Sequence, residues 1–397
     1  MISVSEASAI IFANLFQPKR MATPIEESVG LVLDEHIVAD RDLPPFDRVT
    51  MDGIAINFDA WKKGIRRFQI ESLQAAGEPQ KKLLQNDNAV EVMTGAVLPL
   101  GTDTVIRYED LKIEKPWVNI QAENIEKGQS IHRKGQDAKK DDILLSSGMM
   151  IFPSEVALMA SVGKSRVKVR SFPSAAIVAS GDELIAVEDS PLPHQIRRSN
   201  SYALQSAMRQ MGWYANQYHL KDDKVHLKRE LQSLLTEHDV IILSGGVSQG
   251  KFDFIPQVME ELGVQKKIHQ VSQRPGKPLW FGTSASGKVV FALPGNPVST
   301  FMCFYKYVRP WLLKSFGADI RESKAILARD FSFAPKLTYF LQVSVTNEDG
   351  RLMAYPDAGG GSGDFANLKK VDGFLELPSD RQDFKKGEAF PFIPFRL

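Results

Sequence analysis

The most regular pattern along the chain is an alternation of short apolar runs and amphipathic segments between residues 174 and 316. The apolar runs have the length of buried strands, and they predict strands at 175–179, 239–243, 266–271 and 289–293. The intervening segments have helical periodicity and predict helices at 201–211, 222–237, 254–262 and 298–316. Strands that alternate with helices are typical of a parallel sheet covered on both faces. We therefore predict a doubly wound α/β domain over residues 173–317.

The flanking segments follow other patterns. Residues 46–139 contain short alternating runs separated by Gly and Pro, with few helix signals, and predict an inserted β-rich domain. Residues 318–397 have the same character and predict a C-terminal β domain. Residues 1–45 and 140–172 combine amphipathic helices with short strands and predict a mixed α/β linker domain. Four domains agree with a length of 397 residues.

Composition narrows the classes of function. Apolar residues make up 43% and charged residues 24%, as in a globular protein, and the net charge of +1 gives no bulk attraction to nucleic acid or anionic membranes. No apolar run is long enough to span a bilayer, and the N-terminus lacks the basic start of a signal peptide. The expected compartment is therefore the cytoplasm.

Thiol and imidazole chemistry are unlikely roles for the few residues that carry them. Cys303 is the only cysteine and lies in an apolar helical stretch, which favours a core thiol over a nucleophile. No two of the seven histidines have metal-ligand spacing, so a zinc site is not expected. A bound metal would have oxygen ligands, which favours Mg²⁺.

Polar and Gly-rich segments follow three of the predicted strands. They are Ser180-Gly-Asp-Glu183, then residues 244–250 with Asp253, and finally residues 294–299. Ligands of open α/β sheets bind at the carboxyl ends of the strands, so these segments are expected to meet. The backbone N–H groups of such loops, at Gly245, Gly246, Gly295 and Asn296, can cradle phosphate.

Charged side chains near these loops fit the same chemistry. Arg274 and Lys277 supply positive charge, and Glu183 and Asp253 are candidate ligands for Mg²⁺ on phosphate oxygens. Each motif also has a purely structural explanation: a tight Gly-Gly turn, a Pro-Gly-Asn-Pro turn, or carboxylates that cap a helix. Three loops at one sheet edge favour a phosphate site. Neither a Walker lysine nor a G-x-G-x-x-G motif is present.

Four further Gly-containing segments have no clear role from spacing alone. Asp52-Gly53 and Thr94-Gly95 are typical hairpin turns, and Gly135-Gln-Asp137 is an ordinary loop. The run 359–363 is either a flexible turn or an anion-binding nest.

Taken in order, these motifs resemble the molybdopterin molybdenumtransferases, the family of MoeA and the gephyrin E-domain. The resemblance covers nearly the whole chain. It rests on residues 45–53, 94–103 with Glu109, Gly135 and Asp137, residues 180–184, Ser199-Asn200, residues 245–248 with Asp253, residues 275–278, 293–299 and 361–363, and Asp372-Gly373.

The resemblance implies a reaction and an assembly. Such enzymes take adenylylated molybdopterin (molybdopterin-AMP) and molybdate, cleave the pyrophosphate-type bond with Mg²⁺ or a similar cation, transfer the oxyanion to the pterin dithiolene and release AMP. They are elongated four-domain homodimers with the active cleft between the doubly wound domain of one subunit and the β-rich domain of the other. Further partners would be the molybdopterin adenylyltransferase and apo-molybdoenzymes, with no role for nucleic acid or membrane.

The resemblance also assigns residues. The family's catalytic positions match Asp52, Thr94, Asp137, Glu183 and Asp253. Its molybdate and phosphate contacts match Ser248, Lys277, Pro278, Ser299 and Ser362.

Some positions depart from the family pattern. Leu337 and Gln342 stand in the last domain where the family often has arginines, and Arg198 stands where an Asp usually precedes Ser-Asn. Either Lys336 or Arg198 is a candidate for the missing charge. Three hypotheses follow: an active enzyme, a catalytically weak paralogue that binds molybdopterin-nucleotide, or a dimeric scaffold. The retained carboxylates favour the enzyme.

Overall fold

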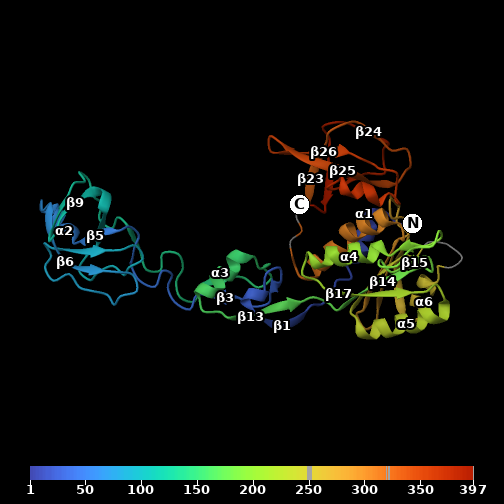
Figure 1. The fold of residues 1–397 in the computed structure, drawn as a ribbon, viewed down its shortest axis with the longest axis horizontal. Coiled ribbons are helices and arrows are strands. Elements are labelled where there is room, and N and C mark those ends of the chain that lie inside the picture. The colour runs from blue at the N-terminus through green and yellow to red at the C-terminus, as the bar shows by residue number, and fades with distance from the viewer. Residues whose placement is uncertain (248–252, 319, 321, 397) are drawn as a thin grey trace.

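The computed structural model describes residues 1–247, 253–318, 320 and 322–396, and it divides into four folded units (Figure 1). The β-rich unit lies at one end of an elongated molecule, and the linker unit lies beside it. The doubly wound unit and the C-terminal β unit lie together at the other end.

The doubly wound unit is built on a six-stranded sheet with the order β17-β14-β18-β22-β21-β19. The first four strands of that order are parallel. The strands are β14 (Ala175–Ser180), β17 (Ala215–Leu220), β18 (Val240–Ser244), β19 (Val264–His269), β21 (Trp280–Ser284) and β22 (Val289–Leu293). The helices are α4 (Ser199–Arg209), α5 (Lys224–Glu237), α6 (Ile255–Glu261), α7 (Pro297–Cys303) and α8 (Arg309–Ser315), with a π-helical turn (Phe304–Val308) between the last two.

Alternate residues of the central strands belong to two different cores. In β18, Val240 and Ile242 pack with α4, α7 and α8, whereas Ile241 and Leu243 pack with α5 and α6. Successive side chains of a strand point to opposite faces, so an entirely apolar run requires cover on both sides. This burial confirms the predicted doubly wound architecture.

Two strands of this sheet escape the sequence pattern. β17 lies at the sheet edge and is mostly half-buried, so no apolar run predicts it. β21 pairs antiparallel with β22 through a short hairpin and antiparallel with β19, so the sheet is parallel in its central part and mixed at one edge. Its run is interrupted by Gly282, where an added Cβ would lie 2.5 Å from the ring of Trp280. Because glycine has no side chain, it interrupts the apolar pattern by which the strand could be recognised in the sequence.

The β-rich unit is a six-stranded sheet with the order β8-β5-β7-β6-β10-β9 and a short helix, α2 (Phe58–Lys62). Its strands are β5 (Gly53–Ile56), β6 (Arg67–Gln74), β7 (Ala89–Val92), β8 (Thr104–Arg107), β9 (Leu111–Glu114) and β10 (Trp117–Ile120). A separate ladder joins β4 (Arg48–Val49) to β11 (Ile131–His132). The two faces of the sheet carry separate apolar clusters, so this unit has its own core.

The linker unit is assembled from two distant parts of the chain. A three-stranded sheet pairs β1 (Lys19–Pro24) and β2 (Val32–Leu33) with β13 (Arg166–Ser171), and β3 (Ile37–Val38) pairs with β12 (Ile143–Leu145). Helix α3 (Pro153–Ser161) completes its core. Helix α1 (Val4–Phe12), which the sequence pattern groups with this unit, packs instead in the core of the doubly wound unit, because its apolar stripe contacts α8 and β19.

The C-terminal unit is a closed β-sheet. Its strands are β23 (Ser323–Leu327), β25 (Thr338–Glu348), β26 (Arg351–Pro356), β27 (Gly373–Leu377) and β29 (Ala389–Pro394), and β25 pairs with both β26 and β27 to close the ring. A ladder of β24 (Phe331–Ser332) with β28 (Asp383–Phe384) lies beside it. The short strand β20 (Gln273–Arg274) comes from the doubly wound unit and pairs with β25, so the two units share a sheet.

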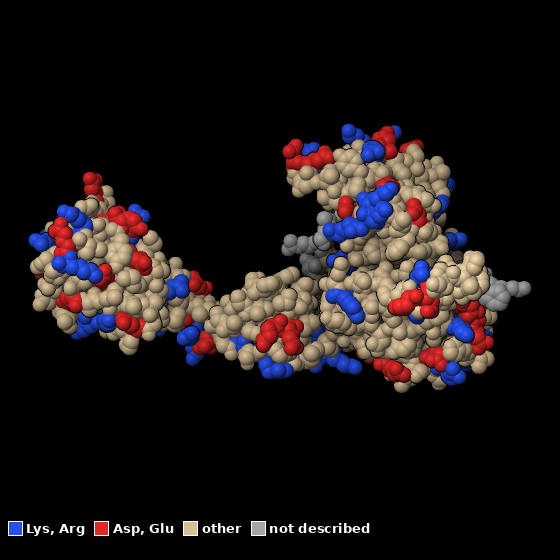
Figure 2. All heavy atoms as spheres, in the orientation of Figure 1, with Lys and Arg blue, Asp and Glu red and all other residues tan. Residues whose placement is uncertain are grey.

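The surface carries charges of both signs. Figure 2 shows Lys and Arg interspersed with Asp and Glu over all four units on the face in view, in keeping with the small net charge. Among the described residues, every helix is too short or too polar to cross a membrane.

Phe291 tests how the central strand supports the sheet edge. Its side chain is fully buried, with ring centroids 4.9 Å from Phe281 and 5.3 Å from Trp311. We expect Phe291→Ala to lower the free energy of unfolding by about 3–5 kcal/mol, because it removes a buried ring and leaves a cavity. Tyr214→Ala, at a side chain that is 72% exposed, is the control. Unfolding in urea is monitored by tryptophan fluorescence. If Phe291→Ala leaves the midpoint of this transition unchanged, the packing described here is contradicted.

Candidate active site

A cavity of about 940 Å³ lies between the carboxyl edge of the doubly wound sheet and the C-terminal unit. Its walls combine the segments after β14, β18 and β22, the start of α4 and the loop after β20. The C-terminal unit adds part of β25 and the glycine-rich run before Ser362. The described parts of the three predicted loops, at residues 180–183, 244–247 and 294–299, therefore meet at this cavity.

Glycines allow the loop after β18 to lie against its neighbours. Gly245 and Gly246 have positive φ angles of 100° and 67°. A Cβ on Gly245 would lie 2.7 Å from the Ser180 carbonyl oxygen, and one on Gly246 would lie 2.5 Å from Ile255 Cδ1. Both positions therefore require glycine, and the backbone here is open to the cavity.

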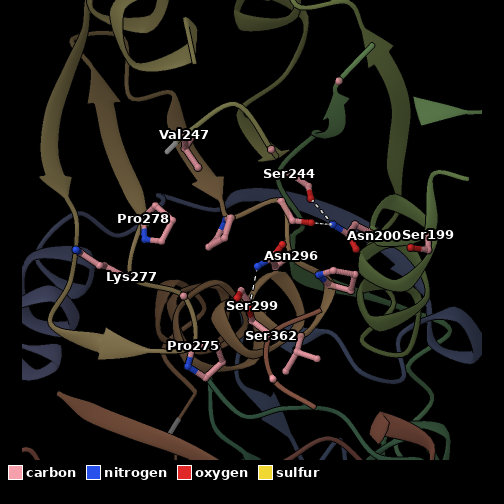
Figure 3. A pocket seen from close by; sticks show the side chains of 18 of the residues that line it. Ser199, Asn200, Ser244, Val247, Pro275, Lys277, Pro278, Asn296, Ser299 and Ser362 are labelled. Atoms are coloured by element: carbon pink, nitrogen blue, oxygen red, sulfur yellow. Dashed lines mark hydrogen bonds between the residues drawn. The ribbon is translucent and has the colours of Figure 1, made fainter. Parts of the chain in front are cut away.

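The side chain of Asn200 ties these loops together (Figure 3). Its Nδ2 donates to Ser244 Oγ at 2.9 Å and to the Gly295 carbonyl oxygen at 2.7 Å. These contacts join the start of α4 to the ends of β18 and β22. The amide thus holds the cavity floor in one arrangement, a positioning role for the Ser-Asn motif.

The C-terminal unit is bonded directly to the third loop. Asn296 Nδ2 donates to Ser362 Oγ at 2.8 Å (Figure 3), and the Val298 N–H donates to the Ser362 carbonyl oxygen at 3.1 Å. Gln342 supports the same wall, because its Nε2 donates to the Ala358 carbonyl oxygen at 3.2 Å. The run 359–363 is therefore a bonded wall of the cavity.

The loop after β20 rests on a buried network. Gln273 Nε2 donates to the Gly276 carbonyl oxygen at 2.9 Å, and Tyr307 donates its hydroxyl proton to Gln273 Oε1. Cys303 packs beneath Gly276 and is fully buried, which raises the pKa of its thiol. Cys303 is therefore the core thiol that its apolar surroundings predict.

Carboxylates gather at one side of the cavity. Glu183 and Asp253 both line it, together with Asp222, which follows β17 and accepts a hydrogen bond from Ser180 Oγ. Burial raises the pKa of Asp222, and the charges of Asp182, Glu183 and Asp253 raise it further. Negative charge of this density is unfavourable unless a cation or proton offsets it.

Within the described ranges, no three His, Cys, Asp or Glu residues converge closely enough to hold a metal ion. Mg²⁺ is commonly bound through one or two carboxylates, with water and substrate phosphate completing its shell. Glu183 and Asp253 fit that limited role and do not form a complete protein cage.

Cationic side chains line the cavity as well. Arg198, Arg274 and Lys277 all contribute to its walls, and none of them forms an ion pair with a described residue. Arg198 is half-buried and donates through Nε to the Ile185 carbonyl oxygen at 3.3 Å. Lys336 is exposed and is not among the lining residues. Of the two candidates for the missing charge, the structure therefore places Arg198 at the cavity.

The remaining predicted residues lie in the distant β-rich unit or its junction with the linker (Figure 1). Asp52 Oδ1 accepts the Thr94 N–H at 2.6 Å, and this hydrogen bond lowers the pKa of Asp52. Asp137 Oδ1 lies 2.8 Å from His132 Nε2. Asp52, Thr94 and Asp137 do not line the cavity of their own chain.

The cavity brings together most of the residues that the sequence singles out. They are Glu183, Gly245, Gly246, Asp253, Arg274, Lys277, Pro278, Gly295, Asn296, Ser299 and Ser362. Ser248 lies outside the described residues. Asp222 is absent from the sequence-based set because a carboxylate at a helix start resembles a cap. Its position directly after β17, beside β14 in the parallel sheet, was the available signal.

The fold and the cavity define a multidomain α/β protein with a cavity at the carboxyl edge of its parallel sheet. Comparison with family models agrees along the chain. Residues 2–163 match the MoeA N-terminal region (domains I and II), residues 176–314 a probable molybdopterin-binding domain, and residues 324–395 the MoeA C-terminal region (domain IV).

Whole-length relatives give the same result. The chain is 40% identical to a molybdopterin molybdenumtransferase from Synechocystis over 99% of both chains. It is 31% identical to one from Staphylococcus epidermidis, over 99% of this chain and 95% of the relative. A solved MoeA protein from Pyrococcus horikoshii superposes with a TM-score of 0.85 at 27% identity, and both chains are covered completely. The chain belongs to the molybdopterin molybdenumtransferase (MoeA) family.

Asp222→Asn tests the repulsion among the carboxylates. Because the pKa of Asp222 is raised in the folded protein, its ionisation costs stability, and this cost appears as the pH rises through that pKa. At neutral pH without divalent cation, we expect the variant to raise the melting temperature of this domain by about 1–3 °C. We also expect a smaller stabilisation by added Mg²⁺ than in the wild type.

Asp189→Asn, at an exposed carboxylate outside the cavity, is the matched control and should change neither quantity. A lower melting temperature for Asp222→Asn, with an undiminished response to Mg²⁺, would show that the carboxylates do not repel one another.

Proposed function

We propose that this protein is a molybdopterin molybdenumtransferase, which inserts molybdate into adenylylated molybdopterin and releases AMP during molybdenum cofactor biosynthesis. The observation that carries the proposal is a single cavity with Gly-rich strand ends, three cationic side chains free of ion pairs with described residues, and a group of carboxylates. Membership of the MoeA family supports it, since the named relatives are molybdopterin molybdenumtransferases.

The cavity wall suits a nucleotide and a tetrahedral dianion. The Gly245 N–H is bonded to the Leu293 carbonyl oxygen and the Val298 N–H to the Ser362 carbonyl oxygen. The N–H groups of Gly246 and of Ser299, in the first turn of α7, are therefore the proposed donors for phosphate oxygens. Lys277 and Arg274 provide charge at the rim. Molybdate needs this mixture of N–H groups, hydroxyls and cations, and the Ser299 hydroxyl group belongs to the same wall.

The carboxylates suit hydrolysis of a phosphoanhydride. In the proposed reaction water attacks the pyrophosphate bond of the adenylylated pterin, AMP leaves, and the pterin keeps its own phosphate. Two Mo–S bonds then form between molybdate and the dithiol, and one molybdate oxygen leaves as water with the two thiol protons. Mg²⁺ held by Glu183 and Asp253 would neutralise charge on the phosphate oxygens. Asp222, whose pKa is raised by burial, adds to the demand for a cation. Water activation is then the role of a carboxylate that remains ionised.

The two sets of site residues require a second chain. The β-rich unit lies at the opposite end of the molecule from the cavity, with the linker unit between them (Figure 1). Asp52, Thr94 and Asp137 therefore act on substrate only if a partner subunit brings them to the cavity. We infer a homodimer with two composite sites, placed in the cytoplasm, with the adenylyltransferase and apo-molybdoenzymes as further partners.

One observation favours a second candidate, a paralogue that binds the nucleotide without turnover. The wall contributed by the C-terminal unit is electrically neutral at Leu337, Tyr339 and Gln342, two of them at the positions where the family often has arginine. The Gln342 side chain is hydrogen-bonded to the Ala358 carbonyl oxygen and does not replace the positive charge of an arginine. The enzyme remains the better account, because Arg198 brings a cation to the opposite wall.

The proposal is tested by AMP release from adenylylated molybdopterin in the presence of Mg²⁺ and molybdate. We expect release by the wild type, and a loss of about 10²-fold or more in Glu183→Gln if that carboxylate helps hold the cation. Glu188→Gln, an exposed carboxylate five residues away and outside the cavity, is the control. Binding of the adenylylated pterin without AMP release by the wild type would establish the binding-only paralogue.

Arg198 tests the source of the missing charge. We expect Arg198→Ala to raise the KM for molybdate about tenfold, the effect of losing roughly 1.4 kcal/mol of charge-assisted binding. Arg209→Ala, at the other end of α4 on an exposed side chain, should leave it unchanged. An unchanged KM for molybdate in Arg198→Ala would remove this residue from the oxyanion site.

A further inference from the structure

We propose that His132 is the positioning residue for Asp137, and that Arg48 fixes the imidazole in the tautomer this role needs. The proposal rests on the proposed function, which gives Asp137 its role in the composite site. His132 Nε2 lies 2.8 Å from Asp137 Oδ1, and Arg48 Nη2 lies 3.0 Å from His132 Nδ1. The three side chains form a hydrogen-bonded Arg–His–Asp array.

The hydrogen-bond chemistry determines where the proton lies. A guanidinium group only donates hydrogen bonds, so His132 Nδ1 must accept from Arg48. The single ring proton is then on Nε2, from which it is donated to the Asp137 carboxylate. The neutral imidazole is therefore the hydrogen-bond donor that orients the Asp137 carboxylate.

The backbone places this array on the same part of the β-rich unit as the other predicted residues. Arg48 and His132 are directly opposite each other in the β4–β11 ladder. Two residues further along, the Thr50 N–H donates to the Ser130 carbonyl oxygen, and the chain continues to Asp52 with its bond from Thr94. Cross-strand pairing thus connects the array to the Asp52–Thr94 turn.

Neighbouring cations are engaged by other acids. Arg133 pairs with Asp47 at 2.7 Å and Lys134 with Asp42 at 3.5 Å. Among the described residues no Lys or Arg pairs with Asp137; its partner is the His132 ring, and its side chain remains 58% exposed. A carboxylate that is oriented by a neutral donor keeps its full charge toward an incoming phosphate-bound cation or a water proton, whereas a lysine or arginine partner would offset it.

The kinetic test uses two substitutions of different hydrogen-bonding capacity. His132→Leu removes the donor, and we expect the kcat for AMP release to fall about tenfold with little change in KM. His132→Gln supplies an amide donor near the position of Nε2, and we expect it to recover most of that loss. His226→Leu, on the surface of α5, is the control.

A double-mutant cycle separates positioning from simple structural support. If His132 acts through Asp137, His132→Leu has no further effect in an Asp137→Asn background. An equal loss in both backgrounds, or no rescue by Gln, would overturn the proposal.

The ¹⁵N NMR spectrum of the full-length protein tests the array without any turnover. We expect His132 to show an unprotonated Nδ1 and a protonated Nε2 at neutral pH, and Arg48→Met to abolish that preference. A protonated Nδ1 in the wild type would overturn the proposal. A wild type that shows the expected spectrum but releases no AMP would instead contradict the proposed function and leave the Arg–His–Asp geometry standing.

Discussion

The separation of the β-rich unit from the cavity is the constraint on which the rest of the account depends. Both chain crossings between the two ends pass through the linker unit, where β1 pairs with β13 and a separate apolar core forms. A folded unit with its own core acts as a spacer, so residues of the β-rich end do not meet the cavity of their own chain (Figure 1). A site that uses both ends must therefore be shared between two copies.

The cavity carries side chains of both charges, and the proposed function requires these charges to be balanced. Carboxylates at Glu183, Asp222 and Asp253 would repel a nucleotide, while Arg198, Arg274 and Lys277 attract it. In the proposed reaction, a cation between carboxylates and phosphate would resolve the conflict, and it would be held well only when substrate completes its shell. The wall from the C-terminal unit is neutral at Leu337, Tyr339 and Gln342, so the proposed function assigns the charge for the oxyanion to Arg198 at the start of α4.

The sequence allowed prediction of those features that depend on local pattern. The apolar runs at β14, β18 and β22 are buried on both sides, so their pattern reveals strands, and the loops that follow must lie at one edge. Strands β17 and β21 were not predicted. β17 is a half-buried edge strand without an apolar run, and the pairing of β21 with β22 is stabilised by tertiary contacts that leave only a weak periodic signal. The packing of α1 against α8 joins residues nearly 300 positions apart, for which one sequence holds no local signal.

The candidate site shows the same division. Gly245 and Asn296 stand in recognisable turn motifs, whereas Asp222 joins the site only through the neighbouring strand and Ser180. The array around Asp137 depends on cross-strand register, which brings Arg48 opposite His132 across 84 positions. Neither Arg48 nor His132 belongs to a recognisable sequence motif, so their contact becomes evident only from the three-dimensional structure.

The central claim, a site divided between two chains, is tested most directly by a heterodimer of two inactive variants. One subunit carries Asp52→Asn and the other Glu183→Gln, each with a different affinity tag, and the doubly tagged dimer is assayed for AMP release. If each site combines the β-rich end of one chain with the cavity of the other, one site is intact, and the heterodimer has about half of the wild-type activity. If the site lies within one chain, both sites carry a substitution, and a heterodimer as inactive as its parent homodimers would contradict the account.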